Sequence, residues 1–265
     1  MRFGICIDIL KAPECKRLGF DYVEGKLNAI AQLSDEDFAS ALDVVKESRI
    51  KVEACSLLFP KTMKLLGPNA VGSAEFVSYL HKAFSRMQNL GASIAVFGSG
   101  KSRFVPAGVR WTDAFEQLVD ITTQIGNVAS KYGVTIVIEP LNRSETNLIN
   151  YMVEGSLLAY QVGLSNVGLL SDLYHVAKEN EDMARISLVS PLLHTHVALL
   201  DGRKYPVRKD PELVSFFSEL KAVGYDGRMS IEGSSSDWIA DSKVALKVLR
   251  ELDGNCDYVS GGLNG

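Results

Sequence analysis

Short apolar runs alternate with longer amphipathic segments along the whole chain. Val134–Ile138 is typical of the runs, because five apolar or β-branched residues stand between Gly133 and Glu139. A short apolar run bounded by turn residues is typical of a strand that is buried on both faces. Eight such runs predict strands at Phe3–Ile7, Tyr22–Val23, Val52–Leu58, Ser93–Phe97, Val134–Ile138, Val167–Leu170, Leu192–Leu199 and Arg228–Ile231.

The segments between the runs have helical periodicity and helix-boundary residues. Ser34 is followed three residues later by Asp37, which resembles a capping-box start. The stretch AEFVSYLHKAFSRMQNLG repeats apolar residues at helical spacing and stops at Gly91. Further helices are predicted at Trp111–Tyr132, Pro211–Val223 and Asp241–Leu252.

Strands that alternate with helices predict parallel strands joined by helical crossovers, and hence an α/β fold. Eight such units in roughly 250 residues fit a (β/α)8 TIM barrel. A doubly wound open sheet would need a glycine fingerprint after the first strand, which IDILKAPECK lacks. We predict one TIM-barrel domain over residues 1–253. We expect a loosely ordered tail over 254–265, because DGNCDYVSGGLNG offers little to bury.

Composition narrows the class of protein. The 265 residues are 46% hydrophobic and carry a net charge of −4, with both signs interspersed. This balance argues against nucleic-acid and membrane-surface partners. No apolar stretch approaches the length of a membrane span, and MRFGICIDIL is too short and polar-flanked for a signal peptide. The four cysteines lack CxxC spacing, which indicates reduced thiols, so we expect a cytoplasmic protein.

Polar side chains stand at or near the ends of the last four predicted strands. They are Glu139, Asp172, His196 and Glu232. In a closed barrel the carboxyl ends of the strands converge at one mouth, where the chemistry of this fold takes place. Three carboxylates there would repel one another unless protons or a cation held them. Three carboxylates and one imidazole suit Mn²⁺, Mg²⁺ or Co²⁺, with Zn²⁺ also possible. A single such acid more often caps a helix or pairs with an arginine, but four in succession favour a metal site.

Two further motifs have both a functional and a structural interpretation. His175 follows Asp172 by three residues, so it either starts the next helix or contacts substrate beside the metal. The segment FGSGKSR contains GKS, but a P-loop would need glycine where Ala95 stands. We interpret it as a glycine turn that points Lys101 and Arg103 into the mouth, with a solvated basic loop as the alternative.

The segment IEPLNRSETN closely resembles strand five of ketose 3-epimerases of the D-tagatose 3-epimerase type, within the xylose-isomerase-like TIM barrel superfamily of sugar phosphate isomerases and epimerases. SDLYH, HTHVAL and SIEG follow in the right order, so the resemblance covers essentially the whole chain. It implies one divalent ion, usually Mn²⁺, held by Glu139, Asp172, His196 and Glu232. It also implies that Glu139 and Glu232 are the catalytic acid/base pair. For substrate binding the resemblance implies His175, Glu145 and Arg203. The arginine of the family would fall at Gly202, so Arg203 stands one residue beyond it.

The function implied by the resemblance is that of a metal-dependent isomerase acting on a small sugar. Such an enzyme moves a proton next to a ketose carbonyl through an enediolate. Epimerisation needs acid and base on opposite faces and aldose–ketose isomerisation needs one face, so both stay open. The epimerases carry aromatic residues after the first strand and IDILK has none, which leaves the sugar undefined.

Phosphorylated and free sugars both stay open as well. A phosphate or carboxylate of the substrate could bind Arg203, Lys204 and Arg208, or the backbone amides of residues 233–236. Two other functions remain as alternatives: a metal-dependent dehydratase or hydrolase of a polyol or sugar acid, and a non-catalytic sugar-binding barrel. The resemblance also allows a homo-oligomer.

Overall fold

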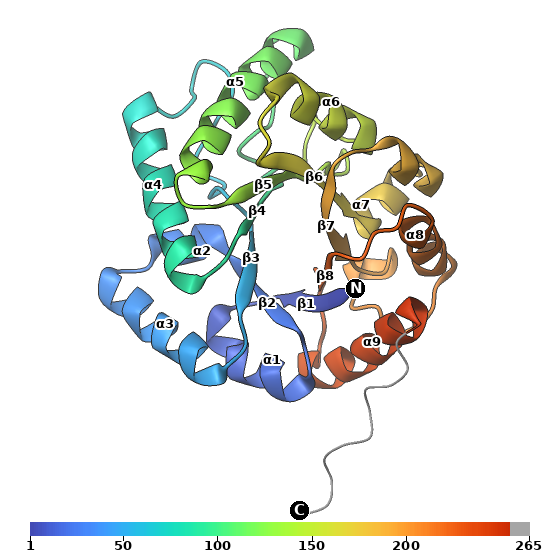
Figure 1. The fold of residues 1–265 in the computed structure, drawn as a ribbon. Helices are drawn as coiled ribbons and strands as arrows, with labels where there is room; N and C mark the ends of the chain where they lie inside the picture. The colour runs from blue at the N-terminus through green and yellow to red at the C-terminus, as the bar shows by residue number, and fades with distance from the viewer. Residues whose placement is uncertain (255–265) are drawn as a thin grey trace, which may run out of the picture.

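Eight parallel strands close into a barrel in chain order, with β8 beside β1 (Figure 1). This confirms the predicted (β/α)8 TIM barrel. The computed structural model describes residues 1–254, so the predicted tail lies, apart from Gly254, outside the described residues. The strands are β1 Arg2–Cys6, β2 Tyr22–Lys26, β3 Val52–Ser56, β4 Ile94–Phe97, β5 Thr135–Ile138, β6 Val167–Asp172, β7 Leu192–Val197 and β8 Arg228–Ile231.

A ring of α-helices surrounds the barrel (Figure 1). They are α1 Ala12–Leu18, α2 Leu27–Gln32, α3 Asp35–Ser48, α4 Ser73–Leu90, α5 Trp111–Ser130, α6 Met152–Val162, α7 Leu173–Lys178, α8 Pro211–Ala222 and α9 Trp238–Asp253. Three 3₁₀ turns are η1 Ile9–Lys11, η2 Met183–Leu188 and η3 Asp201–Arg203. The sequence pattern did not predict α1, α2, α6 and α7, which are short and contain few periodic apolar positions. Among the described residues, no helix combines the length and apolar character needed to cross a bilayer.

Local sequence sets the ends of the predicted helices. Ser34 caps α3, and its Oγ accepts a hydrogen bond of 3.0 Å from the backbone N–H of Asp37. Helix α4 ends at Gly91, whose φ of 77° lies in the left-handed region that favours glycine. The last helix begins at Trp238, three residues before its predicted start, because Asp237 accepts a hydrogen bond from the backbone N–H of Ala240. The start of α3, the end of α4 and the start of α9 are therefore set by capping residues more than by the apolar periodicity.

Strand β2 is longer than predicted. The apolar run stops at Val23, but backbone pairing with β3 continues through Glu24 and Gly25 to Lys26, which is opposite Ser56. The extension places polar residues on the inner wall of the barrel. Two other strands end two residues earlier than predicted, since β3 ends at Ser56 and β7 ends at Val197.

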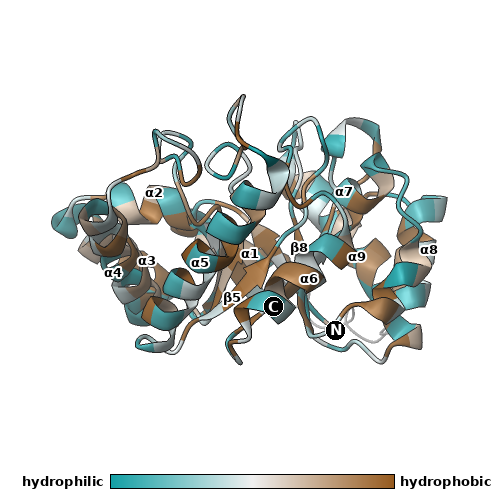
Figure 2. Cartoon of the chain, turned by 90° about the horizontal axis from the view of Figure 1, so that it is seen from above, coloured by the Kyte–Doolittle hydropathy of each residue, from teal (hydrophilic) through white to brown (hydrophobic). Residues whose placement is uncertain are grey.

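Side chains alternate between the two faces of each strand, as expected for a barrel. Outward side chains pack against the helices in the main hydrophobic core, and the hydropathy colouring of Figure 2 shows hydrophobic residues along the strands and along parts of the surrounding helices. A second, smaller apolar cluster comprises Tyr22, Ala54, Ile94, Val96, Val137 and Leu170. Two residues further along β5 and β6 than Val137 and Leu170 stand Glu139 and Asp172, so the barrel interior becomes polar toward its mouth.

Candidate metal centre and active site

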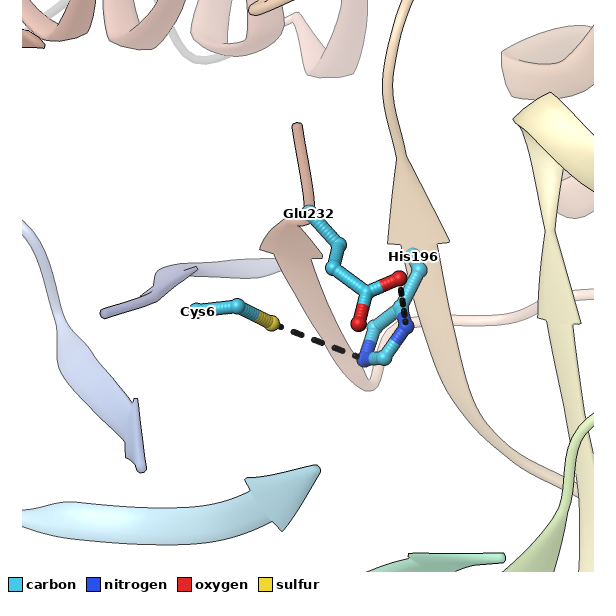
Figure 3. A group of neighbouring side chains, drawn as sticks. All are labelled: Cys6, His196 and Glu232. Atoms are coloured by element: carbon cyan, nitrogen blue, oxygen red, sulfur yellow. Dashed lines mark hydrogen bonds and ion pairs between the residues drawn. The ribbon is translucent and has the colours of Figure 1, made fainter. Parts of the chain in front are cut away.

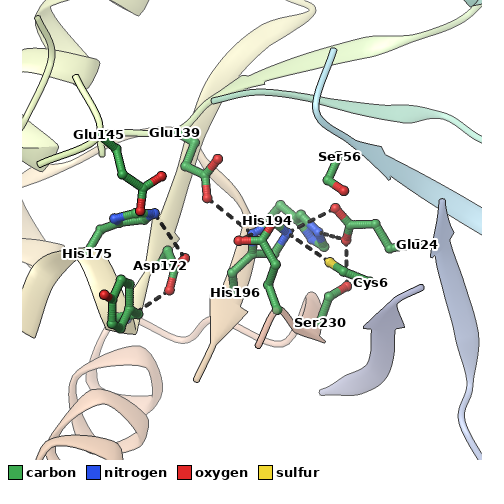
Figure 4. Close-up of polar contacts among 12 residues, drawn as sticks. Cys6, Glu24, Ser56, Glu139, Glu145, Asp172, His175, His194, His196 and Ser230 are labelled. Carbon is green, nitrogen blue, oxygen red and sulfur yellow. Dashed lines mark hydrogen bonds and ion pairs between the residues drawn. The ribbon is translucent and has the colours of Figure 1, made fainter. Parts of the chain in front are cut away.

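The four predicted metal ligands come together at the mouth of the barrel. One ligand atom from each of Glu139, Asp172, His196 and Glu232 lies within 4.8 Å of the others. Nδ1 of His196 is 3.3 Å from Oε1 of Glu139 (Figure 4) and 3.6 Å from Oε2 of Glu232 (Figure 3). Glu139 and Glu232 directly follow β5 and β8, and Asp172 is the last residue of β6. Four neighbouring strands thus direct oxygen and nitrogen donors into one small volume.

The other ring nitrogen of His196, Nε2, contacts the buried carboxylate of Glu24. Nε2 of His196 lies 3.0 Å from Oε1 of Glu24 and 3.9 Å from Sγ of Cys6 (Figures 3 and 4). The second oxygen of Glu24 accepts hydrogen bonds from Ser230 at 2.6 Å and from His194 at 2.7 Å. Both ring nitrogens of His196 therefore face carboxylates; a bound cation would replace the proton on Nδ1, while Glu24 keeps the other proton on Nε2.

Charge within this buried network follows from the same contacts. Burial opposes ionisation of Glu24, but His196 and His194 outweigh burial and hold the pKa of Glu24 well below its ordinary value. Burial would likewise lower the pKa of His196, yet the charge of Glu24 holds it well above the ordinary value. Glu24 is therefore an ionised carboxylate with no exposed surface, stabilised by the two imidazoles.

The carboxylates at the mouth differ in their protonation. Burial, followed by the charge of Glu232, raises the pKa of Glu139 to about 7. Burial also raises the pKa of Asp172 to about 6, against the opposing effect of Arg203. Burial acts on Glu232 as well, but His196 and Arg203 outweigh it and lower the pKa of Glu232 to about 2. Adjacent buried acids that cannot all ionise are the electrostatic signature of a site that accepts a cation.

Two features of the structure fit a divalent ion. Oδ2 of Asp172 is buried without a hydrogen-bond partner among the described residues, while Oδ1 accepts from the backbone N–H of Tyr174 at 2.8 Å. Gly98, after β4, leaves the space beside Glu139 free, because a Cβ there would overlap Oε2 of Glu139. Three carboxylate oxygens and one imidazole nitrogen suit Mn²⁺ or a similar hard divalent ion.

His175 lies beside Asp172 and is neutral. It is 2% exposed, and its Nδ1 accepts hydrogen bonds from the backbone N–H of Asn142 at 3.1 Å and from the Asn142 side chain at 2.8 Å. Burial, aided by the charge of Arg203, lowers the pKa of His175 to about 3. The proton therefore sits on Nε2, which faces Oδ2 of Asp172 at 3.6 Å. A neutral N–H donor at this position is suited to a hydroxyl oxygen.

Arg203 joins the remaining predicted residues. Its guanidinium donates to Oε2 of Glu232 and to Oε1 of Glu145, the latter at 3.1 Å, and stacks over the ring of Tyr174. The turn before it requires Gly202, whose φ is 69°, and Arg203 itself has a φ of 51°. The one-residue offset of Arg203 in the sequence therefore does not prevent it from reaching the site.

The basic residues of FGSGKSR do not enter the mouth as predicted. Arg103 is completely buried and donates to the backbone carbonyl of Glu139 at 2.6 Å, so it supports the end of β5. Lys101 is exposed, and its Nζ lies 5.9 Å from the ring centroid of Phe104. Arg208, a predicted phosphate contact, pairs with Asp210 and Asp201. None of these three side chains lines the cavity above the four ligands.

That cavity has a volume of about 380 Å³, a size suited to a small-molecule ligand. It is lined by Cys6, Lys26, Ser56, Leu57, Ser99, Gly100, Glu139, Leu141, Glu145, Arg203, Glu232, Gly233 and Ser234. The sequence pattern did not indicate a role for Glu24, His194, Asn142 or Lys26. Glu24 was visible as a polar residue after an apolar run, but its partners are distant in the chain.

Comparison with known proteins identifies the family of the chain. A family model described as Xylose isomerase-like TIM barrel matches residues 12–252. The chain belongs to this family.

Relatives within the xylose isomerase-like family include several ketose 3-epimerases. An L-ribulose 3-epimerase of Methylomonas sp. is 28% identical over 251 residues, which cover 92% of this chain and 85% of the relative. A D-psicose 3-epimerase of Agrobacterium fabrum is 25% identical over 91% of this chain and 84% of its own length.

A solved structure shares the same fold. The crystal structure of D-allulose 3-epimerase from Methylomonas sp. superposes with a TM-score of 0.83 at 22% identity, covering 95% of this chain and 98% of that chain.

Proposed function

We propose that this protein is a metal-dependent ketose 3-epimerase. Its relatives over nine-tenths of the chain are ketose 3-epimerases, and the mouth of its barrel carries an acid/base pair suited to that reaction. The observation that carries the proposal is the position of Glu139 and Glu232. Their carboxylates reach the same nitrogen, Nδ1 of His196, from the ends of two different strands, β5 and β8. Both carboxylates also line the cavity, so a substrate held there would meet one carboxyl group from the end of β5 and another from the end of β8.

The separate positions of the two glutamates support a two-base epimerisation. Glu232, which Arg203 holds by a hydrogen bond, removes the proton on C3 of the ketose, and an enediolate forms next to the carbonyl. Glu139, in its protonated form, donates to the opposite face of C3 and so inverts its configuration. In the reverse direction the two groups exchange roles, and proton exchange with water resets the pair.

The remaining side chains bind and orient the substrate. Arg203 holds the Glu232 carboxylate through a charge-assisted hydrogen bond. Glu145 lines the cavity and offers an acceptor, and the buried His175 offers an N–H beside Asp172. Glu139, Asp172, His196 and Glu232 would hold the divalent ion, Mn²⁺ by the choice of donors, which when bound polarises the substrate carbonyl.

The decisive experiment is to follow deuterium uptake from D₂O by NMR with Mn²⁺-loaded protein and a panel of ketoses that includes D-psicose, D-fructose and L-ribulose. We expect label at C3 together with the C3 epimer, and loss of both after treatment with EDTA. Label at C1 or C2 with an aldose as product would instead identify an aldose–ketose isomerase. Loss of water from a polyol or sugar acid, without exchange at C3 of any ketose, would identify a dehydratase and overturn the proposal.

A further inference from the structure

Lys26 stands on the inner wall of the barrel above the metal centre. Residues 24 and 26 of β2 point to the same face of the strand, because side chains alternate, and Glu24 on that face contacts His196. Two residues advance a strand by roughly 7 Å. Lys26 therefore occupies the next layer toward the mouth, where it lines the cavity opposite Ser56 of β3.

The lining of the cavity divides into two chemically different halves. Its acids, Glu139, Glu145 and Glu232, come from the segments after β5 and β8, and the guanidinium of Arg203 is already paired with two of them. The half built from β1 to β4 contains no carboxylate in its lining. Its polar groups are the thiol of Cys6, the hydroxyls of Ser56 and Ser99, and the ammonium of Lys26.

The ammonium of Lys26 has no ion-pair partner among residues 1–254. Asp8 and Asp37 line a neighbouring cavity that Lys26 also borders, but neither forms an ion pair with it. Their carboxylates instead accept hydrogen bonds from the backbone of Leu10 and from the hydroxyl of Ser34, respectively. An exposed cation at the edge of a substrate cavity therefore has its charge available to a ligand.

We propose that Lys26 recognises an anionic group, a phosphate or a carboxylate, at the end of the sugar remote from the reacting carbon. The inference rests on the proposed function, since it takes the reacting end of the sugar to lie at Glu139 and Glu232. A chain of carbons that begins there and crosses the cavity ends in the half that contains Lys26, Ser56 and Ser99. One ammonium with adjacent hydroxyls is a suitable set of donors for a phosphate or carboxylate.

The test uses ligands that cannot react, so that it does not depend on the epimerase assignment. Mn²⁺-loaded protein is titrated calorimetrically with glucitol, glucitol 6-phosphate and gluconate, which are neutral, phosphorylated and carboxylated relatives of one polyol. We expect at least one anionic ligand to bind ten or more times as tightly as glucitol. The stronger of the two identifies the group, and the preference should fall as ionic strength rises, since Lys26 is exposed.

Variants assign the preference to this residue. The preference is measured as the dissociation constant of glucitol divided by that of the tighter anionic ligand. In Lys26→Met this ratio should fall at least tenfold, whereas Lys26→Arg should retain part of the preference. Lys101→Met is the matched control, because Lys101 is also an exposed lysine on a loop at the mouth but does not line the cavity, and its ratio should equal that of the wild type. Equal binding of all three polyols, or an unchanged preference in Lys26→Met, would overturn the inference.

The outcomes separate this inference from the proposed function. Deuterium exchange at C3 of neutral ketoses, without any preference for anionic ligands, would support the epimerase proposal and contradict anion recognition by Lys26. A preference for anionic ligands that depends on Lys26, with no exchange at C3 of free or phosphorylated ketoses, would support the anion site and contradict the epimerase proposal.

Discussion

Oε1 of Glu24 lies 3.0 Å from Nε2 of His196 and thereby turns Nδ1 of the same ring toward Glu139 and Glu232. The contact joins the second strand to the seventh across the barrel. A histidine ligand whose second nitrogen donates to a carboxylate is fixed in its tautomer and orientation.

We expect Glu24→Gln to weaken Mn²⁺ binding by roughly tenfold to hundredfold, the usual effect of removing such a partner. Titration of free Mn²⁺ by electron paramagnetic resonance measures the affinity directly. Ser56→Ala is the control, because Ser56 lies near Glu24 in Figure 4 but has no hydrogen bond to it among the described residues. Equal affinities of wild type and Glu24→Gln would exclude a positioning role for Glu24.

Glu139 makes the stability of the metal-free protein depend on pH. Its pKa rises from 4.5 to about 7 on folding, so the folded state binds the proton more tightly than the unfolded state. Stability should therefore fall as the pH rises from about 4.5 to about 7, by of the order of 1 to 3 kcal/mol.

Glu139→Gln removes this titrating group, so its unfolding free energy in EDTA should depend less on pH and exceed that of the wild type at alkaline pH. Urea unfolding at several pH values measures the difference. The same variant should lose activity by at least about a hundredfold, since it lacks one of the two proposed acid/base groups. Parallel stability profiles of the two proteins would contradict the assigned pKa shift.

Gly98 gives Glu139 its space. Gly98→Ala would place a methyl group on Oε2 of Glu139 and push the carboxylate away from His196. We expect at least about a tenfold loss of Mn²⁺ affinity, comparable with losing a partner of a ligand. Gly72→Ala is a matched control, because Gly72 has an ordinary φ of −64° and nothing within 4 Å of its Cβ position. Calorimetric titration with Mn²⁺ compares the two, and an unaltered affinity in Gly98→Ala would show that Glu139 can relocate without loss.

The opposite end of the barrel has its own ionic contact. Glu53 is 6% exposed and accepts hydrogen bonds of 2.6 Å from both Arg2 and Arg228. Burial opposes its ionisation, but these arginines lower its pKa below 4.5. Its contribution to stability is therefore complete above pH 4.5 and is lost as the pH falls through its lower folded-state pKa.

Glu53→Gln should lower the free energy of unfolding near neutral pH by about 1 to 3 kcal/mol, and the deficit should shrink in acid. Urea unfolding at two pH values measures both effects. Glu47→Gln provides the control, since Glu47 is exposed on α3 and forms no ion pair within residues 1–254. A deficit that stays constant down to strongly acidic pH would point to lost packing instead of lost charge.

The sequence predicted those parts of the site that lie at the ends of clear apolar runs. Glu139, Asp172 and Glu232 follow such runs, His196 lies within the run Leu192–Leu199, and barrel closure brings the four together. Glu24 could not be assigned in the same way, because its partner His196 lies 172 residues away and the contact exists only across the closed barrel.

Lys26 was missed for a related reason. The apolar run of β2 stops at Val23, and only backbone pairing with β3 extends the strand far enough to bring Lys26 to the cavity. The buried state of Arg103 was equally hidden, since a basic residue in a glycine-rich loop is usually solvated, and here its partner is a backbone carbonyl.

Alternate residues of β2 place the buried polar contacts and the cavity-lining charge at different levels along the barrel axis. Tyr22 and Glu24 stand in the lower layers, bound to Ser230 and His196, and Lys26 stands one layer higher, where it has no ion pair among the described residues. A substitution at position 26 can therefore change the charge of the cavity wall while the layer that contains Glu24 and His196 keeps its contacts. Such an arrangement lets a lineage of enzymes diversify, or an engineer retune one, through a single upper position without rebuilding the chemistry beneath it.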